Sequence, residues 1–438
     1  MLGSNCPLSH PGESKSWIPI APSVVPMDER QPAPDRPAEP VILEKPGHPI
    51  SHGDIDRDVL HILFSLHRQG FIAYLTGGAV RDMMLGKHPK DFDVVTDARP
   101  GQIKKRFRNV YVIGRRFRLA HIHFADGKII EVSTFRSEAG PSEENDSDAL
   151  AEPKSVYGTP REDAFRRDIT INALYYDPVT FSVIDYVGGL EDLNRRRVRV
   201  IGDPAERFTE DPVRIWRVIR HAARLGFDIE EATERAILSY RRLLAVTSGA
   251  RLYEELNKDL AYETRPVFEA LRKYNLLKYI LGRIGEDYEV DQKLFSRLDA
   301  LLEIEDRAES RGLFLSLQEM HALIFWPWAE SLLAGVEGDP SQILKNAFLN
   351  AQMRTTIPRS LRANVIQIMI ILRSMIRAIR TGHMRWSLQK RAHYEQASRL
   401  FFLVEKGRTP EGGESFEGLF KEAFPSGTKW RRRRRRRF

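Results

Sequence analysis

The chain has 438 residues, of which 42% are hydrophobic and 29% are charged, a balance typical of a globular protein with about two to four domains. Its single cysteine, Cys6, excludes an intramolecular disulfide framework and a cysteine-based zinc site, so we expect a reducing compartment such as the cytoplasm. The formal net charge is +8, and Arg431 to Arg437 supply seven of these charges, so the rest of the chain is nearly balanced. We see no secretory signal and no apolar stretch long enough to span a membrane.

The first predicted helix follows a long polar leader. Residues 1–48 are rich in proline and polar side chains without periodicity, so we predict that they are disordered. Asp54 is predicted to cap the helix that follows, and Gly70 to end it. The predicted buried face of this helix consists of Val59, Leu60, Ile62, Leu63 and Leu66.

A strand that turns through two glycines into a helix is predicted next. Residues 71–75 are aromatic or branched, as strands prefer, and Gly77 and Gly78 break this run before a short helix over 79–85. Free backbone N–H groups at the start of such a helix favour phosphate, and Arg81 in the first turn adds a positive charge. A glycine pair alone also occurs in ordinary turns.

Two aspartates lie in the following predicted strand, 91–95. Strand alternation would place Asp91 and Asp93 on one face, and Phe92 and Val94 on the other. Two carboxylates on one face repel each other unless a cation lies between them, and Mg²⁺ prefers oxygen ligands. The alternative is a solvated strand edge. A phosphate site beside a divalent metal site would indicate nucleotidyl chemistry.

The two segments together, Gly77-Gly78-Ala79-Val80-Arg81-Asp82 and Asp91-Phe92-Asp93, resemble the head domain of the bacterial class II nucleotidyltransferases. This family comprises poly(A) polymerases and tRNA CCA-adding enzymes. The resemblance implies an α+β fold, in which a nucleotidyltransferase head with a mixed β-sheet and helices precedes an all-α neck, body and tail. The domains expected are a leader (1–48), the head (49–190), a neck that binds nucleotide and RNA (191–285), a helical body (286–410) and a flexible arginine-rich tail (411–438).

The remainder of the head is predicted to contain a helix near 103–107 and strands over 110–113, 119–124 and 128–135. Glu131 in the third strand either faces solvent or is a third acid near the metal, and the family resemblance favours an active-site role. Residues 138–160 are predicted to form a mobile loop.

A basic run lies in the turn between two of these strands. Arg115, Arg116 and Arg118 either face solvent or contact RNA. The run resembles the corresponding segment of poly(A) polymerases more closely than that of CCA-adding enzymes, which is less basic.

Residues 165–174 combine buried-type apolar side chains with Arg167, Asp168 and Asn172, which are costly to bury without partners. These polar residues are either a helix cap with structural ion pairs or part of a site. The run resembles the family motif Arg-Arg-Asp-x-Thr-x-Asn, with Ile169 in place of the usual Phe or Leu. The resemblance implies that Arg167 contacts nucleotide phosphate, that Asp168 is a further catalytic acid, and that Asn172 contacts the nucleotide.

A long helix is predicted from Asp211, its cap, through Pro212 at its first position. Its basic residues either face solvent or form a nucleotide site. The second alternative arises because a carboxylate and a guanidinium one helical turn apart can pair with the edge of a base. The segment resembles the family motif Glu-Asp-x-x-Arg, which implies that Asp211 and Arg214 read the base and that Arg217 contacts phosphate or base. The predicted apolar face is Val213, Trp216, Ile219 and Ala223, and the predicted basic face is Arg214, Arg217, His221 and Arg224.

The rest of the chain is predicted to be helical up to its arginine tail. Helices are predicted over 294–302, 320–332 and 361–379. The tail, with Arg431, Arg432, Arg433, Arg434, Arg435, Arg436 and Arg437, is either a solvated end or a site for nucleic acid, and the nucleotidyl motifs on the same chain favour RNA.

The function implied by the resemblance is template-free addition of AMP from ATP to RNA 3′ ends, with two Mg²⁺ ions held by Asp91 and Asp93. The first alternative is a complete or partial tRNA CCA-adding enzyme, and the second is a catalytically inactive RNA-binding protein on the same fold. The partners implied are RNA 3′ ends, ATP and RNA-decay machinery or an RNA chaperone. We expect a monomer with no membrane contact.

Overall fold

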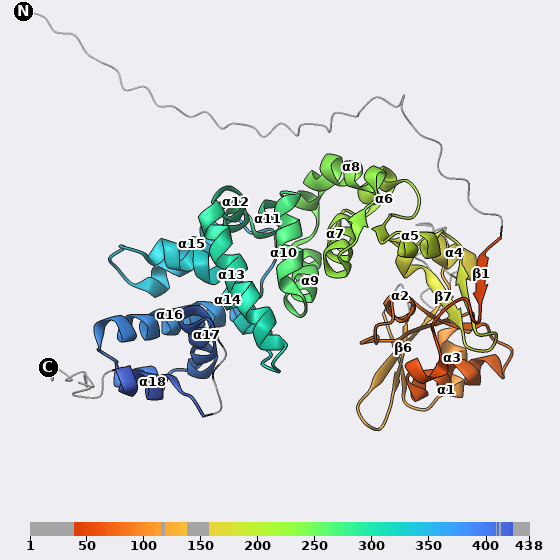
Figure 1. The fold of residues 1–438 in the computed structure, drawn as a ribbon, viewed down its shortest axis with the longest axis horizontal. Coiled ribbons are helices and arrows are strands. Elements are labelled where there is room, and N and C mark those ends of the chain that lie inside the picture. The colour runs from red at the N-terminus through yellow and green to blue at the C-terminus, as the bar shows by residue number, and fades with distance from the viewer. Residues whose placement is uncertain (1–38, 115–118, 138–156, 409, 411–412, 424–438) are drawn as a thin grey trace, which may run out of the picture. The chain divides into compact units, whose positions relative to one another are not determined.

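The N-terminal part of the computed structural model is a mixed β-sheet, and the C-terminal part is helical (Figure 1). The structure describes residues 39–114, 119–137, 157–408, 410 and 413–423. The eight strands of the sheet lie in the order β1-β8-β7-β2-β3-β6-β5-β4. Only β3 and β6 run parallel, and every other neighbouring pair is antiparallel. The strands are β1 (Val41–Glu44), β2 (Ala73–Thr76), β3 (Asp93–Thr96), β4 (Val110–Ile113), β5 (Leu119–His123), β6 (Ile129–Thr134), β7 (Leu174–Asp177) and β8 (Ser182–Asp185).

Short helices cover the sheet and connect its strands. They are the 3₁₀ turns η2 (His52–Asp54) and η4 (Thr170–Asn172) and the helices α1 (Arg57–His67), α2 (Gly78–Met84), α3 (Pro100–Arg106), α4 (Pro160–Phe165) and α5 (Gly189–Asn194). α1 packs on β2 and β3, and α3 packs on β4 and β5. Of the predicted buried face of α1, all but the half-buried Leu60 are buried.

The predicted cap of the first helix is wrong by two residues. α1 begins at Arg57, and the Asp56 side chain accepts a hydrogen bond of 2.8 Å from the Asp58 backbone N–H. Asp54 instead closes the preceding 3₁₀ turn, where its carboxylate accepts from the backbone N–H and the hydroxyl of Ser51. Both aspartates can satisfy free N–H groups, so local sequence alone does not separate them.

The predicted strand around the two acids is shorter than expected. β3 begins at Asp93, which pairs with Thr76, the last residue of β2. Because β2 ends there, Asp91 has no strand partner and precedes the ladder. The predicted start of the strand at Asp91 is therefore wrong, and strand alternation does not determine where the Asp91 side chain points, although its charge raises the pKa of Asp93.

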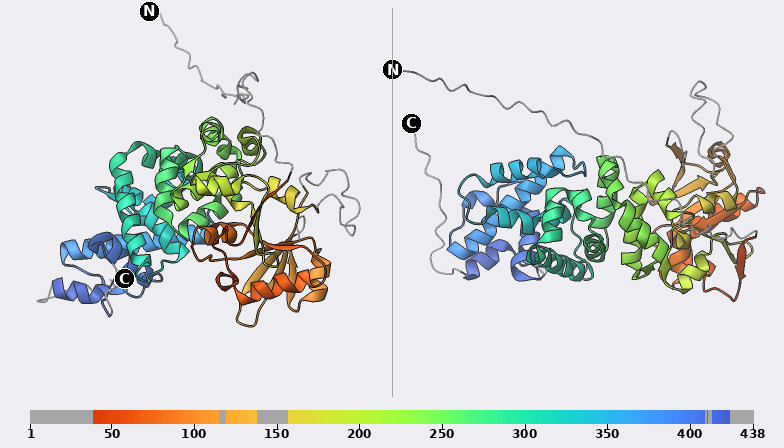
Figure 2. Two further views of the ribbon diagram at one scale, coloured as in Figure 1. Left: turned by 45° about the vertical axis from the view of Figure 1, so that its right-hand side comes forward. Right: turned by 90° about the horizontal axis from the view of Figure 1, so that it is seen from above.

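The C-terminal part is built almost entirely from helices, which Figure 2 shows from two further directions. Its only strands in the described residues are β9 (Arg197–Val198) and β10 (Asp228–Ile229), which pair in parallel. The predicted helices over 294–302, 320–332 and 361–379 are confirmed within α13, α14 and α16. The helical elements are α6 (Pro204–Glu210), α7 (Val213–Leu225), α8 (Glu231–Tyr240), η5 (Arg241–Val246), α9 (Gly249–Leu260), α10 (Thr264–Lys273), α11 (Leu277–Leu281), α12 (Arg283–Val290), α13 (Gln292–Glu309), α14 (Leu317–Leu333), α15 (Pro340–Asn350), α16 (Arg359–Thr381), η6 (Trp386–Leu388), α17 (Tyr394–Lys406) and α18 (Phe416–Ala423).

The helix α7 anchors this helical part. It packs against α9 and α10 and also contacts β9. Val213, Trp216 and Ile219 of its predicted apolar face are buried, and Ala223 is half-buried. Across all the residues that the structure describes, no helix is both long and apolar enough to span a bilayer.

Candidate active site

The turn between β2 and α2 brings the backbone close to two charged side chains. Gly77 has a φ of +75°, in the left-handed region that other residues rarely adopt. A Cβ atom on Gly77 would lie 3.3 Å from Asp93 Oδ2 and 3.9 Å from Arg167 Nη1. The absence of a side chain at Gly77 therefore allows Asp93 and Arg167 to approach the start of α2. The predicted strand, glycine turn and helix are confirmed.

Asp93 and Glu131 are neighbours across the parallel strands β3 and β6. Residues in register on adjacent strands share a face of the sheet, so the two acids lie side by side. Desolvation by the surrounding protein raises the pKa of Asp93, the charges of Glu131 and then Asp91 raise it further, and Arg167 opposes them. Asp93 nevertheless retains exposed surface and is reachable from solvent. The sheet thus places Glu131 beside Asp93, as its active-site interpretation requires.

The oxygen donors near Asp93 fit a hard divalent cation. The neighbouring carboxylates raise the pKa of Asp93, so a cation between them would relieve their repulsion. Within the described ranges, no three or more His, Cys, Asp or Glu side chains are arranged as a protein-only metal cage. Mg²⁺ is usually held by one or two carboxylates together with substrate phosphates and water. Asp91 and Asp93 therefore fit Mg²⁺ as an ion that binds together with a nucleotide.

Arg167 is fixed in place by Asp163 of α4. Its Nε and Nη2 atoms donate to Asp163 Oδ2 over 3.1 and 2.9 Å, and its Nη1 atom donates to the Asn172 carbonyl over 3.2 Å. The Tyr175 hydroxyl donates to the same Asp163 oxygen over 2.9 Å. These bonds hold the guanidinium beside Gly77 and Asp93. The sequence prediction missed Asp163, although the Thr159-Pro160-x-Glu162 capping box that positions α4 was readable.

Arg81, Asn172 and His221 form a chain of contacts from α2 to α7. Arg81 Nη1 donates to Asn172 Oδ1 over 2.7 Å, and its Nε and Nη2 atoms donate to Asp82 Oδ1. Asn172 Nδ2 donates to His221 Nε2 over 3.3 Å. Burial lowers the pKa of His221 to about 3, and nearby guanidinium groups such as that of Arg81 act in the same direction. His221 is therefore neutral and can accept this bond at physiological pH.

Asp168 pairs with Arg217 of α7 over 2.8 Å between Oδ2 and Nη2. Burial is the largest single influence and opposes ionisation of Asp168, but Arg217 and the other interactions of the carboxylate, among them a hydrogen bond from the Ile169 backbone N–H, together lower the pKa of Asp168. The basic face of α7 thus contacts the polar run 167–172 through Arg217 and His221. His221 contacts Asn172, and Arg217 pairs with Asp168 while its side chain stays 41% exposed.

Asp211 lies just before α7 and is tied to α9. The helix starts at Val213, one residue later than predicted, and Asp211 Oδ1 accepts from the Val213 backbone N–H over 3.2 Å. Asp211 Oδ2 accepts from Arg251 Nη2 over 2.8 Å. The N-cap position of α7 is therefore Pro212 and the predicted cap is one residue too early, although the Asp211 carboxylate still accepts from the first N–H of the helix. Arg251, 40 residues away, was not predicted because no local pattern links it to Asp211.

Arg214 has partners other than Asp211. Its Nη1 atom donates to the Arg207 carbonyl and to Glu210 Oε2, both over 2.9 Å. Asp211 and Arg214 are thus anchored separately, at the end of α6 and at the start of α7.

The remaining predicted site residues belong to basic runs. Arg115, Arg116 and Arg118, and likewise Arg431 to Arg437, lie outside the described residues. Their predicted contacts with RNA stay predictions.

Two family models match this chain. The model described as "Poly A polymerase head domain" matches residues 73–199, which include the glycine turn, the acids and Arg167. The model described as "Probable RNA and SrmB- binding site of polymerase A" matches residues 226–284.

Individual relatives are similar over different shares of the chain. A poly(A) polymerase I of Salmonella typhimurium is 36% identical over 83% of this chain and 78% of its own length. A CCA-adding enzyme of Bacillus pumilus is 40% identical over 45% of this chain and 48% of its own length. The crystal structure of the Bacillus stearothermophilus CCA-adding enzyme in complex with CTP has a TM-score of 0.59 at 24% identity, over 84% of this chain and 82% of that chain, which shows a shared fold. The chain therefore belongs to the family of bacterial poly(A) polymerase I and the CCA-adding enzymes, and it is a nucleotidyltransferase that acts on RNA.

Proposed function

We propose that this chain is a poly(A) polymerase, which transfers AMP from ATP to the 3′ end of RNA without a template. The observation that carries the proposal is the meeting of Asp93, Glu131 and Arg167 beside the Gly77 turn. Poly(A) polymerase I relatives also match over 83% of the chain, whereas the CCA-adding relative matches over 45%. This difference in coverage favours poly(A) synthesis over CCA addition.

The proposed chemistry is an exchange of one P–O bond for another. The RNA 3′ oxygen attacks the α-phosphorus of ATP, loses its proton, and displaces pyrophosphate. Asp91 and Asp93 would hold Mg²⁺, which when bound would lower the pKa of the attacking hydroxyl and neutralise charge on the phosphates. Glu131 would add a further negative charge beside this cation site.

The triphosphate is proposed to lie over the glycine turn. The N–H groups of Gly77 and Gly78 and the guanidinium of Arg167 would contact its oxygens, as helix starts and bidentate guanidinium groups do elsewhere. Arg81 contributes positive charge on the same side and holds Asn172 toward the nucleotide.

The base is proposed to lie between Asp211 and Arg214. Adenine presents a donor, the N6 amino group, and an acceptor, N1, on one edge. A carboxylate accepts from the first and a guanidinium donates to the second, so Asp211 and Arg214 match adenine. Arg217 would orient Asp168 and contact the nucleotide. Arg251 would hold the Asp211 carboxylate in one orientation and thereby increase the selectivity for adenine.

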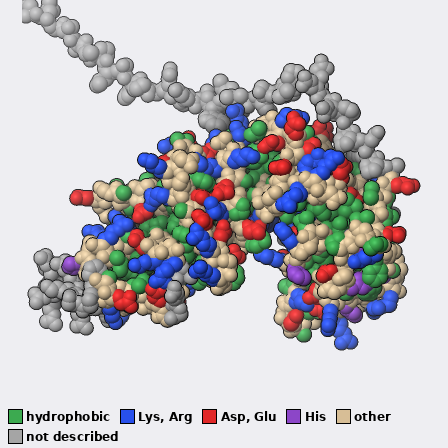
Figure 3. Space-filling model, viewed as in Figure 1, with side chains coloured by type: hydrophobic (Ala, Val, Ile, Leu, Met, Phe, Trp, Pro, Cys, Tyr) green, Lys and Arg blue, Asp and Glu red, His purple; other side chains and the backbone are tan. Residues whose placement is uncertain are grey.

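RNA is proposed to be held mainly through its phosphates. Basic and acidic side chains are interspersed on the surface that Figure 3 shows. Arg115, Arg116, Arg118 and Arg431 to Arg437 would therefore add much of the sequence-independent attraction, which falls as salt rises.

A single-nucleotide extension assay tests this function. With Mg²⁺ and each nucleotide triphosphate in turn, we expect long additions to unstructured RNA with ATP alone, because the proposed base contacts match adenine. One to three additions restricted to tRNA, with CTP or ATP, would instead establish a CCA-adding enzyme. When a chelator replaces Mg²⁺ in this assay, the wild-type protein should show no extension.

The contact between Lys90 and Tyr262 gives a second prediction. The Lys90 ammonium lies 3.1 Å from the centroid of the Tyr262 ring, and Arg224 Nη2 donates to the Tyr262 carbonyl over 2.6 Å. Lys90 directly precedes Asp91, so this ring steadies the loop that carries a proposed metal ligand. Replacing Tyr262 by leucine should remove about 1–2 kcal/mol of cation–π attraction and lower kcat about 5- to 30-fold.

The matched control for this prediction is Tyr262→Phe, which keeps the ring and loses only the hydroxyl. It should retain nearly wild-type kcat, and both variants should keep the KM for RNA. Equal losses of kcat in the two variants would contradict a role for the ring.

A further inference from the structure

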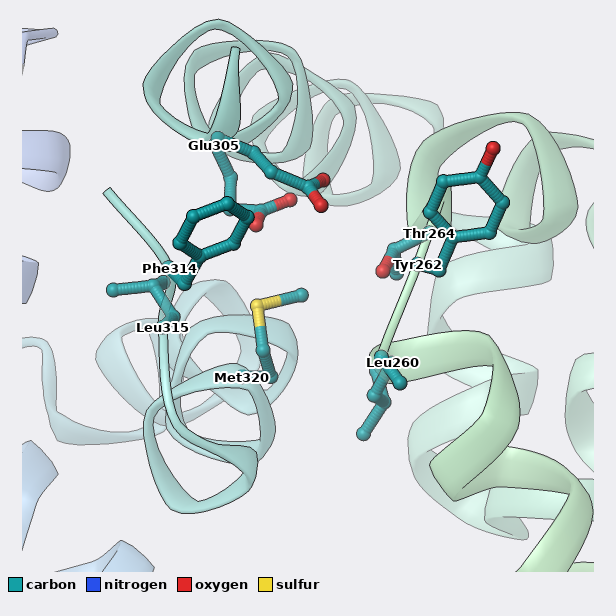
Figure 4. Close-up of a pocket in the computed structure, with 9 residues that line it drawn as sticks. Leu260, Tyr262, Thr264, Glu305, Phe314, Leu315 and Met320 are labelled. Atoms are coloured by element: carbon teal, nitrogen blue, oxygen red, sulfur yellow. The ribbon is translucent and has the colours of Figure 1, made fainter. Parts of the chain in front are cut away.

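A small pocket lies between the turn that follows α9 and the loop that precedes α14. Its walls include Leu260, Tyr262, Glu305, Phe314, Leu315 and Met320, and it contains about 260 Å³ of space, part of it open to solvent (Figure 4). Glu305 comes from α13, and Phe314 and Leu315 lie between α13 and α14. The pocket is separate from the acids and arginines of the candidate active site. One wall is Tyr262, whose ring also contacts Lys90.

Glu305 is a buried acid without a partner. Only 6% of the residue is exposed, and Figure 4 shows its side chain directed into the pocket. Within the part of the chain that the structure describes, no hydrogen bond or ion pair reaches its carboxylate. Buried polar groups are normally satisfied, and this carboxylate, which borders the open pocket, is available to a ligand from solution.

The electrostatic surroundings of Glu305 favour a positive ligand. Burial, together with the like charges of Asp306 and Glu309 on the same helix, raises the pKa of Glu305 to about 7. The turn after α9 contributes Tyr262, and the loop before α14 contributes Phe314 and Leu315, so neither brings a cation to the pocket. A cationic ligand would replace the proton that Glu305 holds at neutral pH.

The walls of the pocket favour a ligand with an apolar stem. Leu260, Leu315 and Met320 offer hydrocarbon surface, and the rings of Tyr262 and Phe314 offer faces that attract ammonium groups. These walls offer too few oxygens for a bare divalent ion, and the described residues contain no metal-binding cluster of three ligands. RNA phosphates would be repelled by the acids on α13.

We propose that this pocket binds an aliphatic diamine or polyamine, with one primary ammonium group on Glu305 and methylene groups against Leu315 and Met320. A second ammonium group at the pocket mouth would face Glu309. This site is independent of the nucleotidyl transfer proposed above, so binding can be measured whether or not the chain synthesises poly(A).

Calorimetric titration of the full-length protein with 1,4-diaminobutane tests the proposal. At pH near 7 we expect saturable one-to-one binding that releases about half a proton, measurable as a dependence of the heat on the buffer. Butan-1-ol, which has the stem without the charge, should not bind. Glu305→Gln should weaken binding at least about tenfold, because the hydrogen-bonded charge is lost.

The matched control is Glu303→Gln on the same helix, since Glu303 pairs with Arg307 and does not line the pocket. It should bind the diamine like wild type. Glu305→Gln should also fold: removal of an unpaired buried charge should raise its Tm above that of wild type at pH 8 and change it little at pH 5, where wild-type Glu305 is protonated. Glu309→Gln, at the pocket mouth, provides a second variant with a smaller expected loss.

Three results would overturn the proposal. One is equal diamine binding by wild type and Glu305→Gln, and another is equal binding of butan-1-ol and the diamine. The third is stoichiometric displacement of the diamine by Mg²⁺ or by oligoadenylate, which would make the pocket a metal or RNA subsite.

Discussion

Replacing Asp93 by asparagine is expected to lower the rate of nucleotide addition by at least about 10³-fold, which corresponds to about 4 kcal/mol of lost transition-state stabilisation. Asparagine keeps the shape of the side chain and removes its charge. The neighbouring Glu131 and the Gly77 turn should therefore stay in place, while the proposed cation site loses a ligand. Steady-state extension of an unstructured RNA with ATP and Mg²⁺ measures the effect.

Asp126→Asn is the matched control for this prediction. Asp126 is exposed, and its Oδ2 atom lies 3.8 Å from Lys128 Nζ, away from the proposed site. Asp126→Asn therefore changes the net charge of the protein by the same amount as Asp93→Asn without touching the site. Its activity should equal that of wild type, and both variants should bind RNA with unchanged affinity. If Asp93→Asn extended RNA as fast as wild type, acids other than Asp93 would hold the metal. If neither protein extended RNA, the chain would act only as an RNA-binding protein.

Replacing Asp259 by alanine is expected to destabilise the protein by about 3–5 kcal/mol, the usual cost of removing one partner from a buried ion pair. Asp259 is fully buried, accepts a hydrogen bond of 2.5 Å from Trp216 Nε1, and pairs with Arg220. Without it, the indole N–H is unsatisfied and Arg220 retains only Glu255 as a carboxylate partner among the described residues. Because these bonds join α7 to α9, urea unfolding followed by tryptophan fluorescence should report the loss.

Removal of an exposed pair provides the comparison. Glu231 and Arg235 pair on α8 with most of their side-chain surface exposed, so Glu231→Ala should cost less than about 0.5 kcal/mol. A cost for Asp259→Ala as small as that of Glu231→Ala would show that the buried network does not stabilise the junction of α7 and α9.

Most strands of the sheet were predictable because their signals are local, but β1 (Val41–Glu44), inside the leader that was predicted to be disordered, pairs with β8, so that prediction is wrong for this segment. The apolar run before Gly77, the glycine turn and the short helix after it all follow from neighbouring residues. The role of Glu131 was ambiguous, because one strand with a single acid does not reveal which strand lies beside it. Its parallel pairing with Asp93 comes from a connection through two other strands.

The partners of the site residues were not predictable, because they are distant in the sequence. Arg251 lies on another helix from Asp211, and His221 meets Asn172 across 49 residues. The basic face of α7 matched the pattern of a solvated helix equally well. Only the packing of α7 against the polar run 167–172 shows which of its basic side chains contact protein and which face solvent.

The position of β7 determines when this site can assemble. β2, which leads into the glycine turn, is paired on one side with β3 and on the other with β7, about 100 residues further along the chain. A nascent chain that has emerged from the ribosome only as far as residue 137 therefore leaves β2 as an open edge, with its hydrogen-bonding groups free to pair with other chains. Synthesis must pass residue 177 before that edge closes, so premature termination within this interval yields an aggregation-prone fragment rather than a smaller enzyme.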